Sequence, residues 1–167
     1  YNIAVGGSAL QSNTTASNNA AFGWRALNAN TTGHSLVAVG DSALKSNTTA
    51  IANTAIGRAA LEANTTGASN TAVGRSALQV NTTGANNVAI GTSALDANTT
   101  GNGNVGIGVE ALTVITTGSD NVAIGQSALE KTTTASNNTS VGKNSLKENT
   151  TGYDNVAVGV DALQANT

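Results

Sequence analysis

The sequence repeats itself every 17 residues without a single insertion or deletion. The consensus unit is N-[VT]-A-[VI]-G-x-x-A-L-x-x-N-T-T-[GA]-x-x, and positions within a unit are numbered from its first Asn. The glycines of position 5 are Gly6, Gly23, Gly40, Gly57, Gly74, Gly91, Gly108, Gly125, Gly142 and Gly159. Such regularity is typical of a solenoid, because stacked rungs stay in contact only if each has the same perimeter. The spacing therefore predicts that residues 1–167 form one array of ten units, of which the first and last are incomplete. We expect this array to belong to a longer fibre.

Each unit is too short for a helical repeat, because a pair of packed helices needs about 33 residues or more. The run Val88–Ile90 has β-forming residues between Asn87 and Gly91, which predicts a short strand. Residues 93–95 could form a second short strand or an irregular edge, and residues 98–101 have the chemistry of a turn. The sequence thus predicts an all-β parallel β-solenoid of ten rungs spaced roughly 4.8 Å apart, which makes a rod about 45–50 Å long.

The alternation within the strand sorts the side chains into two faces. Position 4 is apolar in every unit, as in Val5 and Ile90, and Phe22 is its largest occupant. Position 3 holds only Ala, Gly or Ser and points to the opposite face of the strand. We expect the position 4 side chains to fill the interior together with the Leu of position 9. We expect the small residues of position 3 to allow close approach by another backbone and to form a second contact face, through which copies of the chain associate.

Few large side chains are available to stabilise such a thin rung. The chain has no Pro, Cys or Met, and its aromatic content is 2%. Because small cores seldom stabilise an isolated chain, we expect several copies to associate along the axis. A single chain with an interior packed by Ala is the alternative.

The unit also resembles a known repeat. Residues 87–91 and 121–125 read N-V-A-I-G, and residues 155–159 read N-V-A-V-G. They resemble the head repeats of YadA-like trimeric autotransporter adhesins, and similar arrays occur in phage tail-fibre-like proteins. The resemblance implies a left-handed parallel β-roll, a homotrimer and a role in attachment at a bacterial cell surface or in a virion fibre. It supplies no catalytic residues, and the 17-residue period is longer than the commonest rung of those heads.

One stretch departs from the repeat and is a candidate ligand patch. The patch consists of Phe22, Trp24, Arg25 and His34, which with Leu36 fall in two neighbouring units where the repeat is least regular. Exposed aromatic rings beside a cation can bind a glycan or a protein receptor. The alternative is local repacking around Phe22. We expect His34 to lie in an outward turn, because its position is variable and a lone His without Cys cannot form a standard zinc site.

The Asn-Thr-Thr segments allow three interpretations. They form columns of Asn and Thr that could stabilise turns, they match the glycosylation sequon, and their paired Thr columns resemble flat ice-binding arrays. Structural columns are the simplest interpretation. The sequons begin at Asn13, Asn30, Asn47, Asn64, Asn81, Asn98 and Asn149.

Charge and composition exclude several functional classes. The net charge of −2 and the scattered Lys and Arg residues argue against nucleic-acid binding. No apolar run is long enough to insert into a membrane, and the carboxylates form no acid–base pair. We therefore predict no enzyme activity, no metal and no cofactor. The predicted function is a structural shaft or head segment of an extracellular trimeric fibre or adhesin; the alternative is a solenoid that binds a glycan, a protein or ice.

Overall fold

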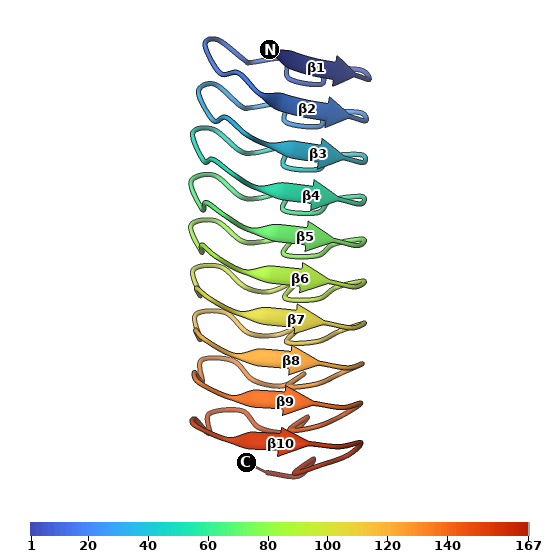
Figure 1. Ribbon diagram of the computed structural model, residues 1–167, viewed down its shortest axis with the longest axis vertical. Coiled ribbons are helices and arrows are strands. Elements are labelled where there is room, and N and C mark those ends of the chain that lie inside the picture. Colours follow the sequence, from blue (N-terminus) through green and yellow to red (C-terminus); the bar gives the residue numbers. More distant parts are fainter. Residues whose placement is uncertain (167) are drawn as a thin grey trace.

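Each unit contributes one short strand to a continuous parallel sheet, as the computed structural model shows (Figure 1). The structure describes residues 1–166. The strands are β1 (Asn2–Val5), β2 (Asn19–Phe22), β3 (Val37–Val39), β4 (Thr54–Ile56), β5 (Thr71–Val73), β6 (Val88–Ile90), β7 (Val105–Ile107), β8 (Val122–Ile124), β9 (Thr139–Val141) and β10 (Val156–Val158). They pair in sequence order, and every residue lies opposite its equivalent in the next rung, as Ala72 does opposite Ala89. The predicted all-β parallel solenoid of 17-residue rungs is therefore confirmed.

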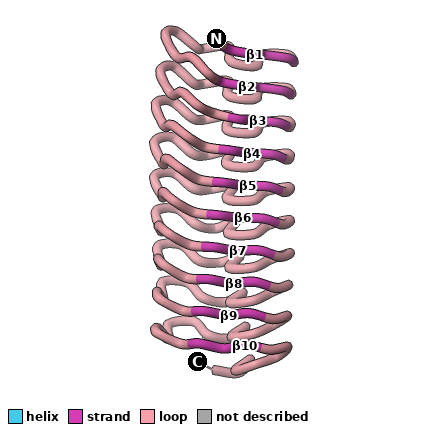
Figure 2. Tube along the Cα trace, viewed as in Figure 1, coloured by secondary structure: helices cyan, strands magenta, loops and turns pink. Residues whose placement is uncertain are grey.

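The rest of each rung forms a second wall without regular strands (Figure 2). Residues 93–95 lie in a turn, so the irregular edge is the correct alternative. This wall is still bonded from rung to rung, since the Leu78 N–H donates to the Ala94 carbonyl at 3.0 Å. Among residues 1–166 there is no helix with the length and apolar character to cross a membrane.

The interior is narrower than the sequence suggested. Between the first and last rungs, the side chains of position 3, such as Ala72 and Ala89, are fully buried, together with those of position 8 and the Leu of position 9. By contrast, Ile90 of position 4 is 39% exposed and points outward. The prediction that position 4 fills the interior was wrong. The prediction that position 3 forms a contact face between copies was also wrong, because position 3 is itself the interior. The Leu side chains already occupy the space: at Gly106, an added Cβ would lie 3.2 Å from Leu95 Cγ, so position 3 has room for little more than a methyl group.

The buried leucines adopt an unusual backbone conformation. All ten leucines of position 9 have positive φ, from 47° at Leu163 to 54° at Leu95. This left-handed conformation costs roughly 1–2 kcal/mol for a residue with a side chain. Complete burial of the Leu side chain offsets that cost, and burial is available only when rungs lie above and below.

The glycines of position 5 are required for two reasons. Gly74 has φ of 138°, a conformation that residues with a side chain seldom adopt. In addition, a Cβ at Gly74 would lie 2.4 Å from the carbonyl oxygen of Gly91 in the next rung. The rungs therefore stack at this corner with backbone directly against backbone.

We predict that Gly74→Ala lowers the free energy of unfolding by about 2–4 kcal/mol, because it combines backbone strain with a steric clash. The matched control is Gly106→Ala at position 3, where every other rung except that of Ser140 already has Ala. Its loss should stay below about 1 kcal/mol, because the backbone there has no positive φ and the atom nearest to the added Cβ, Leu95 Cγ, lies 3.2 Å away. Equal losses in urea-unfolding measurements would contradict this explanation.

Candidate functional site

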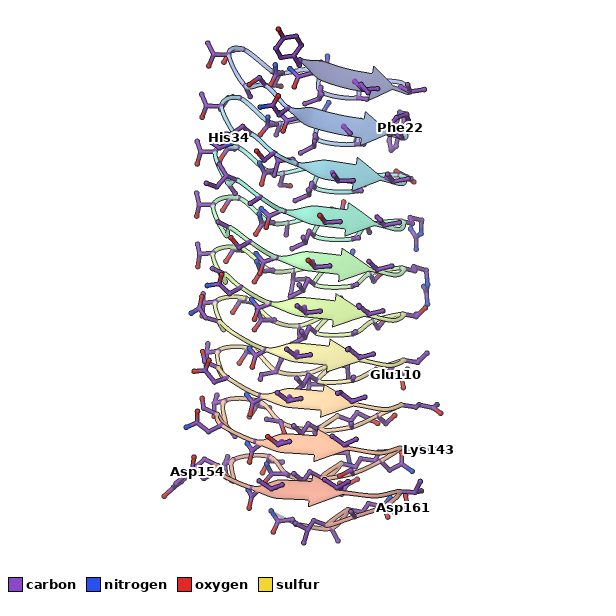
Figure 3. All side chains as sticks on the ribbon, viewed as in Figure 1. Phe22, His34, Glu110, Lys143, Asp154 and Asp161 are labelled. Atoms are coloured by element: carbon purple, nitrogen blue, oxygen red, sulfur yellow. The ribbon has the colours of Figure 1, made fainter. Side chains whose placement is uncertain are left out.

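The outward face of the sheet is the most distinctive surface of the molecule. It is formed by positions 2 and 4 of every strand, and we call it the sheet face (Figure 3). Its twenty residues are Ile3, Val5, Ala20, Phe22, Val37, Val39, Thr54, Ile56, Thr71, Val73, Val88, Ile90, Val105, Ile107, Val122, Ile124, Thr139, Val141, Val156 and Val158. None is charged, although the chain has seven Lys and Arg and nine Asp and Glu residues. Sequence reasoning misplaced position 4 and overlooked this face; the missing charge at both positions was the available signal.

The sheet face runs along all ten strands without interruption. With strands about 4.8 Å apart and about 3.3 Å per residue, it measures roughly 45 Å by 10 Å in projection. Ile56, Ile90 and Ile124 are each 38–40% exposed along it. The largest apolar patch of a soluble monomer typically measures about 300–600 Å² and often has a function, which makes the sheet face a candidate interaction surface.

Two columns of Asn side chains stabilise the turn opposite the start of the strand. Asn19 of position 1 and Asn30 of position 12 both donate from Nδ2 to the Gly33 carbonyl, each at 2.9 Å. The columns also connect rungs, since Asn47 Nδ2 donates to Asn30 Oδ1 at 2.9 Å. Asn30 and Asn47 are fully buried. Their amides are used inside the fold, which confirms the structural interpretation of the Asn column.

The position 12 column is interrupted at two neighbouring rungs. Ile115 and Thr132 stand where other rungs have Asn. Ile115 offers no amide to the rung before it, and Asn98 Oδ1 is left as the one buried side-chain oxygen without a partner among the described residues. Thr132 donates instead from its hydroxyl to the Asn149 carbonyl at 2.7 Å. A buried acceptor without a donor costs about 1–3 kcal/mol.

The two Thr columns have different environments. The hydroxyls of position 13 bond to the next rung, as Thr82 Oγ1 does to the Thr99 carbonyl at 3.0 Å. Position 14, as at Thr83 and Thr100, is exposed in every rung. The ice-binding hypothesis needs two Thr columns with free hydroxyls, but the hydroxyls of position 13 are already hydrogen-bonded within the fold.

The four residues of the predicted ligand patch do not form one cluster. Phe22 ends β2, and Trp24 and Arg25 follow in the next turn, whereas His34 lies at the opposite edge of the rung (Figure 3). Trp24 is 52% exposed, and the Arg25 guanidinium lies 4.2 Å from the centre of its ring. The indole lies over Gly7 of the preceding rung, since a Cβ there would be 3.2 Å from Trp24 Cδ1. His34 is exposed, as predicted.

Charged groups pair mainly between neighbouring rungs. Lys45 Nζ lies 3.1 Å from Glu62 Oε1, and Lys131 Nζ lies 2.7 Å from Glu148 Oε2. Such partly exposed pairs contribute little to stability. Burial raises the pKa of Asp96, with the positive charge of Arg75 acting in the opposite direction. Within residues 1–166, no group of three or more His, Cys, Asp or Glu side chains could hold a metal ion.

Comparison with protein-family models, with curated proteins and with solved structures finds no match for the chain.

We predict that the gap in the Asn column can be closed only by two substitutions together. Ile115→Asn alone gives Asn98 Oδ1 a donor but leaves the new amide oxygen without one, so it should destabilise the protein by about 1 kcal/mol or more. Adding Thr132→Asn supplies that missing donor. The free energies of unfolding of the two single variants and the double variant should show a favourable coupling of about 1–3 kcal/mol. Additive effects would mean that the column contributes no cooperative stability.

Proposed function

We propose that this chain is a structural segment of an extracellular trimeric fibre or adhesin, in which the sheet faces of three copies pack around a common axis. One observation carries the proposal: an uncharged apolar face runs along all ten strands. Burying such a face against an equivalent face removes it from water along its whole length. The resemblance to YadA-like head repeats and phage tail-fibre-like arrays favours three copies and supports a location at a bacterial cell surface or in a virion.

The periodicity of the sheet face argues for a second copy of the chain as its partner. The side chains of this face recur at every rung, about 4.8 Å apart. A partner that matches it over the length of the array must present the same spacing, and another copy does so without further adaptation. Closed rotational symmetry then covers every sheet face and leaves none exposed to aggregate.

The proposed role is mechanical. Every rung is joined to the next by strand pairing, by bonds such as Leu78 N–H to the Ala94 carbonyl, and by the Asn and Thr columns. Load applied along the axis is therefore shared by several parallel columns of hydrogen bonds. A rod of this kind holds a receptor-binding tip away from the surface to which the fibre is attached.

We predict a solution mass of three chains in light scattering, and loss of that mass in Ile124→Lys. The lysine would place three positive charges near the common axis, where they could neither be solvated nor paired. Thr134→Lys is the matched control, because Thr134 lies in the same rung and is exposed outside the sheet face. A three-chain mass retained by Ile124→Lys, or a folded single chain for the unsubstituted protein, would contradict the proposal.

Trp24 supports a second candidate function, binding of a surface glycan or protein receptor. Its ring is exposed and its position next to Arg25 holds it in one orientation. Aromatic rings with a neighbouring cation are common at binding hot spots. This patch lies outside the sheet face except for Phe22, so it would stay available in a trimer.

If the patch binds glycans, Trp24→Ala should reduce binding on a glycan array by about tenfold or more, as expected for loss of a hot-spot residue. Tyr153→Ala is the control, because Tyr153 is an exposed aromatic residue at a distant rung. The absence of glycan binding by the unsubstituted protein would leave the fibre role as the only proposal.

A further inference from the structure

Three neighbouring residues of the second and third rungs depart from the repeat around one point of the sheet face. Ala20 stands at position 2, where every other rung has Val, Ile or Thr. Phe22 stands at position 4, where every other rung has Val or Ile. Leu36 replaces the Asn of position 1 in the next rung. Elsewhere on the sheet face, positions 2 and 4 hold only the β-branched residues Val, Ile and Thr, so these departures single out one level of the rod.

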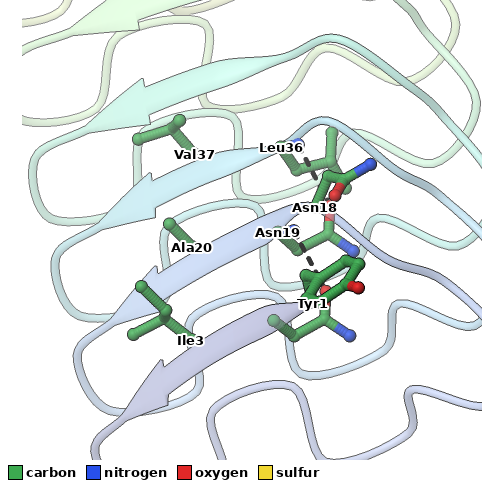
Figure 4. Close-up of a pocket in the computed structure, with 8 residues that line it drawn as sticks. Tyr1, Ile3, Asn18, Asn19, Ala20, Leu36 and Val37 are labelled. Atoms are coloured by element: carbon green, nitrogen blue, oxygen red, sulfur yellow. Dashed lines mark hydrogen bonds between the residues drawn. The ribbon is translucent and has the colours of Figure 1, made fainter.

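A hollow lies at the start of strands β1 to β3, and two of the departures, Ala20 and Leu36, are among its lining residues. It has a volume of about 430 Å³ (Figure 4). Its lining residues are Tyr1, Asn2, Ile3, Asn18, Asn19, Ala20, Leu36 and Val37. Ala20 is the short side chain between Ile3 and Val37 in the column (Figure 4). The fully buried Leu36 adds an apolar side chain where other rungs have an amide.

Phe22 does not fill this hollow in its own chain, because it lies at the other end of β2 and is absent from the lining. Its ring remains 39% exposed. An Ala–Phe pair has about the same combined volume as the Val–Val pair of the next rung. The total side-chain volume at positions 2 and 4 is therefore unchanged in this rung, but most of it lies at the end of the strand instead of being shared between both ends.

Closed symmetry brings these two ends together. When three strands at one level form a triangle around an axis, the end of each strand adjoins the start of the next chain's strand. Position 4 of one copy then meets position 2 of its neighbour. Phe22 of one copy meets the hollow at Ala20 of the next copy only if the chains are parallel and their equivalent rungs lie at the same height along the axis.

Apart from these departures, the rungs differ on the sheet face only in the choice among Val, Ile and Thr, which fixes that level weakly. A shift of one copy by a whole rung brings Val, Ile and Thr opposite the same residue types and loses the contacts of a single rung out of ten. Pairings that can slip without a change of environment are weakly specified. A shift past the second rung, by contrast, presses Phe22 against a β-branched side chain and leaves the hollow empty.

We propose that Ala20, Phe22 and Leu36 form a register key, in which Phe22 of one copy fills the hollow at Ala20 of the next and fixes the copies parallel and in register. This inference rests on the proposed association through the sheet face. The occupant of the hollow is then the phenyl ring of Phe22 from a second copy of this chain.

The test uses disulfide formation far from the key, because the chain has no native Cys. Val88→Cys with Ile90→Cys places thiols that meet between copies in register. Val88→Cys with Ile107→Cys places thiols that meet only after a shift of one rung. A disulfide needs Cβ atoms about 3.5–4.5 Å apart, so neither pair can close within its own strand or across one rung diagonally, and a one-rung shift is resolved.

In the otherwise native sequence, the in-register pair should form interchain disulfides at least about tenfold more than the shifted pair. With Ala20→Val and Phe22→Val added, the shifted pair should rise to within about threefold of the in-register pair, because one-rung shifts lose their penalty. Thr71→Val with Val73→Ile is the matched control. It alters the same two positions of the fifth rung without a large–small pair and should leave the selectivity unchanged.

The outcomes separate the key from the fibre proposal. A single-chain mass before any key substitution overturns the association and the key together. A three-chain mass with unchanged selectivity after Ala20→Val and Phe22→Val overturns the key alone, since the register would then be set elsewhere. A key moved by one rung, through the further changes Val37→Ala and Val39→Phe, is tested in chains that carry a single Cys, mixed with key-native chains that carry only Val88→Cys. Disulfides between the two kinds of chain should then favour Ile107→Cys over Ile90→Cys in the moved-key chain; a preference for Ile90→Cys also overturns the key.

Discussion

Close contact of the backbone between rungs is the constraint on which the rest of this structure depends. At position 5 each glycine lies so near the next that even a Cβ has no room, as at Gly74 against Gly91. The contact can recur nine times along ten rungs only if each rung returns to the same place after the same number of residues. The absence of any insertion or deletion over 167 residues follows directly from this requirement.

The same constraint makes the interior small. The two walls of a rung are held close together, so Ala of positions 3 and 8 and Leu of position 9 fill the space between them. Larger aliphatic residues must then point outward, where ten strands align them into one apolar face. The thin interior and the apolar exterior are therefore two consequences of one geometry, and the proposed association of copies compensates for the limited burial within one chain.

Departures from the repeat show which contacts are cooperative. Ile115 removes one donor from the Asn column, and the effect appears one rung away, at Asn98 Oδ1. Leu36 likewise interrupts the position 1 column beside the hollow over Ala20. Because each rung contacts only its neighbours, such changes stay local and the stack continues on either side.

The repeat by itself determined the rung length, the strand at Val88–Ile90, the structural role of the Asn column and the exposure of Trp24 and His34. Sequence alone could not decide which strand face is interior, because alternation defines two faces but does not show which of them points inward. Only the tertiary structure decided this, since the width of the rung depends on the left-handed turn at each Leu, such as Leu95, and on how near the opposite wall then lies. It also separated His34 from Phe22 and Trp24, because residues close in sequence can lie at opposite edges of one rung.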